Sequence, residues 1–280
     1  MTITREAVAS TALLVAAIRA EESTRPDCLF NDPFADKLAG EEGRRLLAVA
    51  VAETGEQPTL PIVIRTRYWD EALLRADTPQ VVILAAGMDA RAYRLSWPPA
   101  TTVYELDQPA VIATKNALLA DEQPSCTRIT VGVDLTDDWP KSLEAKGFTP
   151  STKTVWLIEG LLQYLDESTA GTLFERIDAL SADDSTLCYD VVGAALLRAR
   201  NVQSTQSFMT RLGAPWTFGT DEPAALVERF GWTAEVTDVA EPGYEWKRWP
   251  TPPAPPDDTG APRGYFVTAR KGMAGYGIAT

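Results

Sequence analysis

The chain has 280 residues, of which 45% are hydrophobic, so it can bury a sizeable core without disulfides or metal ions. Its formal net charge of -13 disfavours DNA, RNA and membrane surfaces as partners, since Lys and Arg occur only singly or in pairs. The chain has no histidine, which excludes histidine-based catalytic triads, histidine metal ligands and a histidine general base. No metal ion is therefore expected.

The N-terminal apolar run from Ala12 to Ile18 is too short to span a bilayer and lacks a downstream cleavage pattern. We expect it to form part of a helix that faces the core. The three cysteines, Cys28, Cys126 and Cys188, are far apart and have no motif spacing. They indicate a reduced, cytoplasmic protein in which each cysteine is a small core residue.

Further along the chain, short apolar runs alternate with helical patterns. The expected strands are Val81–Ala86, Thr101–Leu106, Arg128–Val133, Thr154–Ile158, Thr186–Val192, Ala234–Val239 and Gly264–Ala269, the last two pairing at one end of the sheet. The expected helices are Pro109–Ala120, Asp166–Leu180 and Ala224–Phe230. This alternation predicts a doubly wound, mostly parallel α/β sheet of the Rossmann-like kind.

We expect a single domain over residues 1–280, with four parts. These are a helical N-terminal extension (1–75), a cofactor-binding core (76–193), an inserted lid (194–220) and a C-terminal completion of the sheet (221–280). The aromatic and Met side chains of the insertion, such as Phe208, Met209 and Trp216, could cover a substrate or simply pack into the core. The proline-rich segment Trp249–Pro262 is expected to be a surface loop.

Polar or small residues follow several expected strands directly. The turn at Ala85–Asp89 has small residues that let the backbone approach a ligand. Asp107, about 20 residues after the turn, suits the hydroxyls of a ribose, although a solvated loop acid is the alternative. Asp134, with the backbone N–H that follows it, could bind an adenine edge or cap the next turn. Glu159 can attract a sulfonium or ammonium cation, and Tyr164 adds a polar group on an aromatic ring. Glu159 and Tyr164 are the candidate catalytic residues.

A nicotinamide dehydrogenase is the main competing interpretation of these acids. No tyrosine has a lysine four residues later, as short-chain dehydrogenases require. The turn also has one glycine where a pyrophosphate needs two or three. S-adenosylmethionine carries no phosphate, so the turn Ala85–Gly87 tolerates it better.

Several motifs in register resemble one known family. They are Asn31–Ala35, Arg65–Asp70, Ala85–Leu95, Tyr104–Pro109, Asp134–Leu135 and Glu159–Leu162. Together they resemble the leucine carboxyl methyltransferase family, and more closely its bacterial branch, which includes O-methyltransferases of polyketide pathways. The resemblance covers about residues 10 to 190, and the last third matches only in general architecture.

The resemblance implies S-adenosylmethionine as the cofactor. It implies Arg67 as the partner of the methionine carboxylate, with Arg19 in a similar role. The other implied contacts are Ala85 and Gly87 at the methionine and ribose, Asp107 at the ribose, Asp134 and Leu135 at the adenine, and Glu159 near the amino group. Two residues depart from the family pattern, because its usual Gly and Thr are replaced by Ala85 and Ala90.

Methyl transfer is an in-line displacement for which the protein mainly supplies alignment. A carboxylate acceptor needs no base, whereas a hydroxyl would need Glu, Asp or Tyr to take its proton. The absence of histidine therefore favours a carboxylate or an acidic phenol of a small molecule. The alternatives are a family member that binds the cofactor with little turnover and, less favoured, a nucleotide-linked oxidoreductase.

Overall fold

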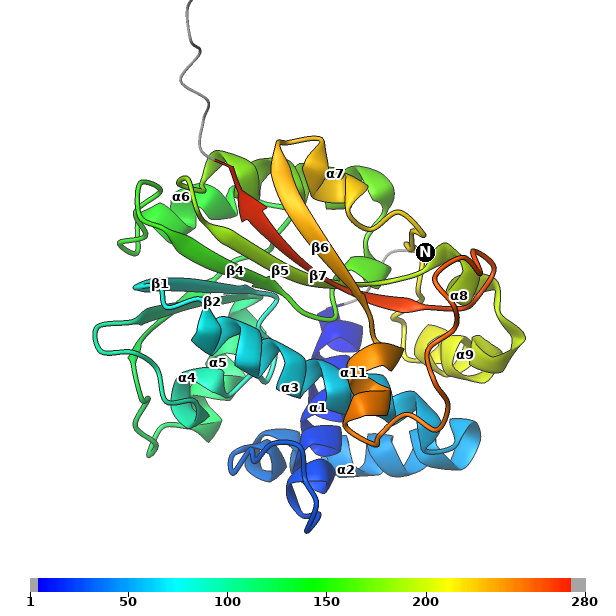
Figure 1. Cartoon of the computed structure of the whole chain (residues 1–280). Helices are drawn as coiled ribbons and strands as arrows, with labels where there is room; N and C mark the ends of the chain where they lie inside the picture. Colours follow the sequence, from blue (N-terminus) through cyan, green and yellow to red (C-terminus); the bar gives the residue numbers. More distant parts are fainter. Residues whose placement is uncertain (1–4, 273–280) are drawn as a thin grey trace, which may run out of the picture.

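The computed structural model describes residues 5–272 and shows a seven-stranded sheet between two layers of helices (Figure 1). The strands are β1 Gln80–Leu84, β2 Thr102–Asp107, β3 Thr127–Gly132, β4 Thr154–Ile158, β5 Thr186–Val192, β6 Trp232–Asp238 and β7 Gly264–Lys271. Their order is β3-β2-β1-β4-β5-β7-β6, with β7 antiparallel to both neighbours and the other pairs parallel. Residues 1–4 and 273–280 of the expected domain lie outside the described residues.

Eleven α-helices and three short 3-10 helices occur in the described part of the chain. The α-helices are α1 Arg5–Ser23, α2 Ala35–Thr54, α3 Leu60–Arg75, α4 Arg91–Arg94, α5 Pro109–Leu118, α6 Trp139–Glu144, α7 Glu167–Ala179, α8 Ala194–Arg198, α9 Gln203–Arg211, α10 Ala225–Glu228 and α11 Ala240–Glu245. The 3-10 helices are η1 Gln57–Thr59, η2 Leu162–Tyr164 and η3 Arg200–Val202.

The predicted α/β sheet is confirmed. Two expected strands coincide with β4 and β5, and the other five differ from the observed strands by at most two residues at either end. The two late strands pair with each other at one end of the sheet, as expected. Asp166 caps α7, because its Oδ1 accepts a hydrogen bond of 2.7 Å from the Thr169 N–H.

The core lies on both faces of the sheet because its central strands are apolar throughout. Along β1, Val82 and Leu84 pack with α6 and α7 on one face. Val81 and Ile83 pack with α3 on the other face. A strand that is buried on both faces is expected to be apolar along most of its length, and β1 has this pattern.

The N-terminal helices form a separate hydrophobic cluster with α9. Leu14 and Ile18 of α1 are buried there, so the expectation of a core-facing N-terminal helix is confirmed. Phe208 and Met209 of α9 are buried in the same cluster and also line the main cavity. The insertion therefore packs into a core while the same two side chains line the main cavity, and its role as a cover over a substrate stays a prediction.

The order of the strands creates a crevice at one edge of the sheet. The chain runs outward from β1 to β2 and β3, then returns so that β4 lies on the other side of β1. In open α/β sheets, ligands bind outside the carboxyl ends of the strands at such a switch point. The strands β1, β2, β3 and β4 all end at this crevice, so the residues that directly follow them line it.

Candidate functional site

A large cavity of about 1600 Å³ occupies the crevice. Its walls come from the carboxyl ends of the strands, from α1, α3 and α9, and from the loop before β7. Sites for one small molecule usually have volumes of about 300–1000 Å³. The cavity therefore has room for two small molecules side by side.

The turn after β1 is tight and left-handed. Ala85 has φ of 52° and Gly87 has φ of 46°, and a Cβ at Gly87 would lie 3.1 Å from the Ala12 Cβ on α1. A left-handed conformation costs a residue with a side chain about 1–2 kcal/mol. The family's usual glycine at this position therefore has a conformational reason, and Ala85 carries strain in this chain. At the second departure, Ala90 precedes α4 without a side-chain cap.

Asp107 closes this turn from the neighbouring strand. Its Oδ2 accepts a hydrogen bond of 2.6 Å from the Gly87 N–H, and its Oδ1 accepts one of 2.7 Å from the Gln108 N–H. Burial raises the pKa of Asp107 in spite of these two donors. The residue is only 3% exposed and lines the cavity, so the alternative of a solvated loop acid is wrong.

Asp134 follows β3 and has a structural role. Its Oδ1 accepts hydrogen bonds from the Thr136 N–H at 3.0 Å and from the Thr136 hydroxyl at 2.8 Å. It therefore caps the turn, as one of the two alternatives anticipated. Asp134 and Leu135 both line the cavity, so this role leaves them in reach of a ligand.

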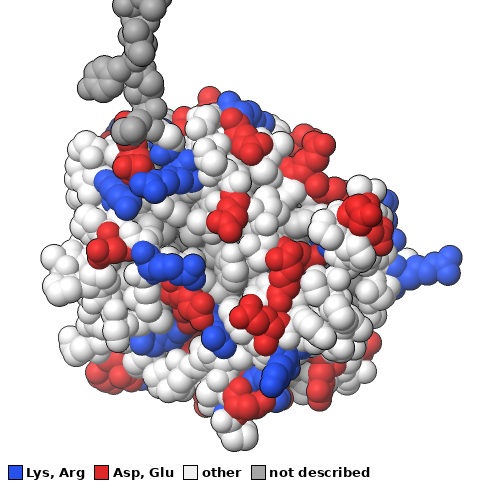
Figure 2. All heavy atoms as spheres, in the orientation of Figure 1, with Lys and Arg blue, Asp and Glu red and all other residues white. Residues whose placement is uncertain are grey.

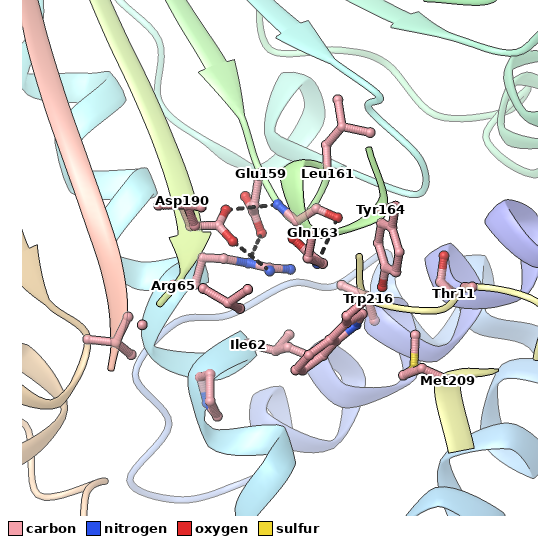
Figure 3. A pocket seen from close by; sticks show the side chains of 18 of the residues that line it. Thr11, Ile62, Arg65, Glu159, Leu161, Gln163, Tyr164, Asp190, Met209 and Trp216 are labelled. Atoms are coloured by element: carbon pink, nitrogen blue, oxygen red, sulfur yellow. Dashed lines mark hydrogen bonds and ion pairs between the residues drawn. The ribbon is translucent and has the colours of Figure 1, made fainter. Parts of the chain in front are cut away.

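Glu159 lies between the guanidinium groups of Arg65, which Figure 3 shows, and of Arg91. Its Oε1 is 2.9 Å from Arg65 Nε, and its Oε2 is 2.6 Å from Arg91 Nη1. Burial alone would raise the pKa of Glu159, but the charges of Arg91 and Arg65 lower it below its usual value. The carboxylate therefore stays ionised, which makes Glu159 a weak proton acceptor.

Arg91 is a residue that sequence reasoning missed. It is 1% exposed, and it donates to Asp70 Oδ1 at 2.6 Å and to the Thr66 carbonyl at 3.2 Å, besides bonding Asp89 and Glu159. An arginine in the middle of the family-like motif Ala85–Leu95 was the available signal. Its burial among carboxylates fixes the position of Glu159.

The arginine that lines the cavity is Arg65, whereas Arg67, which the resemblance implied as the partner of the methionine carboxylate, does not line it. Arg67 pairs with Glu71 at 2.9 Å and lies over the ring of Trp246, outside the cavity. Arg65 lines the cavity and pairs with Glu159. Residues two apart on an α-helix point in nearly opposite directions, so only one arginine of the pair can face the site.

Arg19 lines the cavity from α1 and is 5% exposed. Its Nε lies 3.1 Å from Asp32 Oδ2, and its Nη2 donates to the Met88 carbonyl. The guanidinium thus ties the N-terminal helices to the turn after β1.

Asp190 and Gly160 also escaped the sequence reasoning. Asp190 Oδ1 accepts a hydrogen bond of 2.8 Å from the Gly160 N–H, and its Oδ2 is 3.3 Å from Arg65 Nη1. Gly160 has φ of 66°, and a Cβ there would lie 2.9 Å from the same Arg65 nitrogen. The glycine is therefore required for Arg65 to lie against the loop. Asp190 lies within an expected strand, two residues before its end, so the rule that found Glu159, which takes the residue after a strand, does not select it.

The rest of the cavity is mostly apolar. Ile62, Leu161, Met209 and Trp216 are among its lining side chains (Figure 3). Burial raises the pKa of Tyr164, so its hydroxyl stays protonated. This part of the cavity offers shape and apolar contact more than charge.

The described residues offer neither a cluster of metal ligands nor a membrane-spanning helix. Within residues 5–272, no group of three or more Cys, Asp or Glu side chains could hold a metal ion. Over the same range, no helix combines the length and apolar character needed to cross a bilayer. On the face drawn in Figure 2, acidic and basic side chains are interspersed over a largely uncharged surface.

Solved structures show the same fold. A DUF574 family protein from Streptomyces avermitilis superposes with a TM-score of 0.65 at 13% identity, covering 93% of this chain and 97% of that one. A structure from Thermobifida fusca, described as a "putative methyltransferase", gives a TM-score of 0.59 at 17% identity, with 97% of this chain and 96% of that one covered.

Sequence relatives carry the comparison further. A Mycobacterium tuberculosis protein named "Putative S-adenosyl-L-methionine-dependent methyltransferase" is 39% identical over 263 residues, which cover 87% of this chain and 80% of the relative. A Mycolicibacterium smegmatis protein of similar description is 46% identical over 195 residues, covering 64% of this chain and 65% of the relative. The family model described as leucine carboxyl methyltransferase matches residues 12–178. This chain therefore belongs to the leucine carboxyl methyltransferase family and is an S-adenosylmethionine-dependent methyltransferase.

Proposed function

We propose that this enzyme methylates an oxygen atom of a small, largely apolar molecule. The observation that carries the proposal is the arrangement of groups around the turn after β1, where Asp107, Glu159 and Arg65 all line one cavity. The apolar walls beyond this turn supply the space for an acceptor. When bound, S-adenosylmethionine supplies an electrophilic methyl group on a sulfonium sulfur.

The donor set fits the chemical groups of this cofactor. Asp107 would accept hydrogen bonds from the ribose hydroxyls, and the turn at Ala85 and Gly87 would allow the ligand to approach the backbone closely. Asp134 and the backbone of Leu135 would take the adenine. The turn lacks the repeated glycines that a pyrophosphate requires, which argues against a dinucleotide.

The amino-acid end of the cofactor needs one cationic and one anionic partner. Arg65 would bind the methionine carboxylate, in the role that the resemblance gave to Arg67, and Glu159 would lie near the amino group. Arg19 would add positive charge from α1. Because Arg91 holds Glu159 ionised, this carboxylate is suited to binding a cation and poorly suited to removing a proton.

Within this proposal the protein accelerates the reaction by alignment and by excluding water. Holding the acceptor oxygen in line with the methyl group can contribute about 7–11 kcal/mol of the barrier. Met209 and Trp216 of the insertion would cover the acceptor and keep water out. The cytoplasm is our proposed location, supported by three cysteines that are all free.

The proposal is tested first by titration calorimetry with S-adenosylmethionine, S-adenosylhomocysteine and NAD. We expect one site per chain for the first two ligands and no heat from NAD. A small-molecule acceptor library is then incubated with the enzyme, and the methylated atom is identified by NMR. Transfer to nitrogen or carbon, or binding without turnover of any acceptor, would overturn the proposal of O-methylation.

A further inference from the structure

Two carboxylates at the carboxyl ends of neighbouring strands share one arginine but differ in their other partners. Glu159 follows β4, and Asp190 lies in β5, which pairs with β4. Arg65 Nε is 2.9 Å from Glu159 Oε1, and Arg65 Nη1 is 3.3 Å from Asp190 Oδ2 (Figure 3). Glu159 has a second guanidinium, that of Arg91, at 2.6 Å. The other partner of Asp190 is the neutral N–H of Gly160 at 2.8 Å.

These surroundings shift the pKa values of the two carboxylates in opposite directions. The pKa of Glu159 is lowered, because two guanidinium groups outweigh its burial. The pKa of Asp190 is raised, because burial, together with the charge of Glu159, outweighs the single contact with Arg65. The titratable groups that face Asp190 are Arg65 from α3, Glu159 from the end of β4 and Tyr164 from η2. Paired groups of divergent acidity are typical of sites that divide electrostatic and proton-transfer roles.

The other acids and phenols of the cavity have different tasks. Burial keeps the Tyr164 hydroxyl protonated, and Asp107 is engaged by two backbone N–H groups in the turn after β1. The remaining acids are held as caps or in ion pairs: Asp89 by Arg91, Asp134 by Thr136, Asp166 by Thr169 and Asp238 by Arg263. Asp190 differs from these acids because its one cationic contact, with Arg65, is long at 3.3 Å. It lines the cavity between the turn after β1 and the apolar side chains.

The charges around Asp190 also discriminate between acceptors. A carboxylate acceptor would approach Glu159 and Asp190 together, and the guanidinium groups of Arg65 and Arg91 are already paired with these two carboxylates. Like charges at such short range disfavour binding. A neutral hydroxyl, by contrast, can donate its proton in a hydrogen bond to Asp190.

The apolar walls add a second requirement. Ile62 and Met209 offer apolar contact, while Gln163 Oε1 and Trp216 Nε1 lie close to Tyr164 without a hydrogen bond of acceptable geometry. Gln163 is only 6% exposed. Buried polar atoms without partners are costly, so these two favour a ligand that brings a further polar group.

We propose that the acceptor is a neutral phenolic or enolic hydroxyl on an apolar skeleton, and that Asp190 Oδ2 accepts its proton. The inference rests on the proposed function. As the O–H bond breaks, its proton passes to Asp190 and the oxygen bonds to the methyl carbon. The carbon–sulfur bond of the sulfonium donor breaks, and its electron pair stays on sulfur. No other reactant is needed.

The first test uses 1-naphthol without the cofactor and follows its affinity as pH is lowered from about 8 to about 4, the range in which raised carboxyl pKa values fall. The wild type should lose at least about 3-fold in affinity, because Asp190 becomes protonated and stops accepting the hydrogen bond. Asp190→Asn should show no such dependence. The matched control is Asp238→Asn, which removes a carboxylate of similar burial that pairs with Arg263. It should retain the wild-type dependence. A dependence that survives in Asp190→Asn would overturn the proposal.

The second test compares turnover of three acceptors with S-adenosylmethionine. These are 1-naphthol, 4-nitro-1-naphthol, whose hydroxyl is already ionised at neutral pH, and 1-naphthoate. Asp190→Asn should lower turnover of 1-naphthol by about 100-fold or more, in the range for loss of a general base. Turnover of the nitro compound should fall by less than about 10-fold, since it has no proton to lose.

Other results would contradict the inference. Equal losses for both naphthols, accompanied by weaker cofactor binding, would make Asp190 only a positioning residue for Arg65. A preference for 1-naphthoate, or no binding of either naphthol, would overturn the acceptor class. Calorimetry with S-adenosylhomocysteine distinguishes a failure of the proposed function from a failure of the inference about Asp190. If this ligand does not bind, the proposed function fails, whereas binding without naphthol methylation makes only this inference fail.

Discussion

The two halves of the cavity are built in different ways. The cofactor half, which we define by Arg19, Ala85–Gly87, Asp107, Asp134–Leu135 and Glu159, is made chiefly of strand ends and the residues next to them. The acceptor half, defined by Ile62, Gln163, Asp190, Met209 and Trp216, joins segments far apart in the sequence. Most charges of the cofactor half are paired, whereas the acceptor half is apolar and contains polar atoms without partners. The sheet fixes the positions of the residues in the first half, whereas a ligand could supply hydrogen-bond partners for polar atoms in the second half.

The largest effect is expected from the arginine beneath the cofactor half. Arg91→Met should lower the free energy of unfolding by about 3–5 kcal/mol, because it removes a buried cation that three carboxylates share. The matched control is Arg67→Met, which removes a helix-surface ion pair with Glu71 and a contact with the Trp246 ring and should cost less than about 2 kcal/mol. Urea denaturation measures both. Similar small losses would show that the paired charges do not organise this half.

The next effect concerns the glycine that lets Arg65 lie against the loop. Gly160→Ala should weaken S-adenosylhomocysteine binding by at least about 10-fold, or about 1.4 kcal/mol, because the new Cβ displaces the guanidinium. Gly231→Ala is the control, since Gly231 also has a positive φ but has open space around its Cβ position. Both variants should lose about 1–2 kcal/mol of stability. Calorimetry should find only the first impaired in binding, and equal affinities would contradict the account.

A smaller effect should come from relieving strain in the turn. Ala85→Gly should raise the free energy of unfolding by about 0.5–1 kcal/mol, because glycine adopts a positive φ without penalty. Ala86→Gly, one residue away at a position without positive φ, should lower it by about the same amount. Thermal or urea denaturation compares the two. A loss of stability in both variants would mean that Ala85 is not strained.

The smallest effect on the free energy of unfolding is expected from Trp216→Phe in the acceptor half, and Trp97→Phe, outside the cavity, is its matched control. Trp97→Phe removes a hydrogen bond of 2.8 Å from the indole Nε1 to the Arg91 carbonyl. Trp216→Phe removes an indole N–H that has no partner of acceptable geometry. We expect Trp97→Phe to cost about 1 kcal/mol more than Trp216→Phe in urea denaturation. The reverse order would show that Trp216 already has a structural partner and is not available to a ligand.

The sheet and much of the cofactor half could be predicted from the sequence because both follow local rules. An apolar run marks a buried strand, and the residue after it lies at the edge where ligands bind. Asp107 and Glu159 were located in this way, and both line the cavity. Asp190 lies within an expected strand, so the same rule does not select it.

Other features depend on contacts that no local pattern shows. The choice between Arg65 and Arg67 depends on which side of α3 faces the sheet, and the sequence motif contains both. The positive φ of Ala85 depends on how the turn is held by Asp107. The acceptor half could be predicted only in part, because the sequence suggested Met209 and Trp216 as a possible substrate cover, whereas the place of Met209 depends on the packing of α9 against α2.

The central claim is that one cavity holds the cofactor on the strand ends and leaves Asp190 facing the acceptor. It is tested most directly by a crystal structure with S-adenosylhomocysteine bound. The account predicts the ribose hydroxyls at Asp107, the methionine carboxylate at Arg65 and open space beside Asp190. A ligand whose carboxylate contacts Arg67, or whose ribose lies away from Asp107, would contradict it.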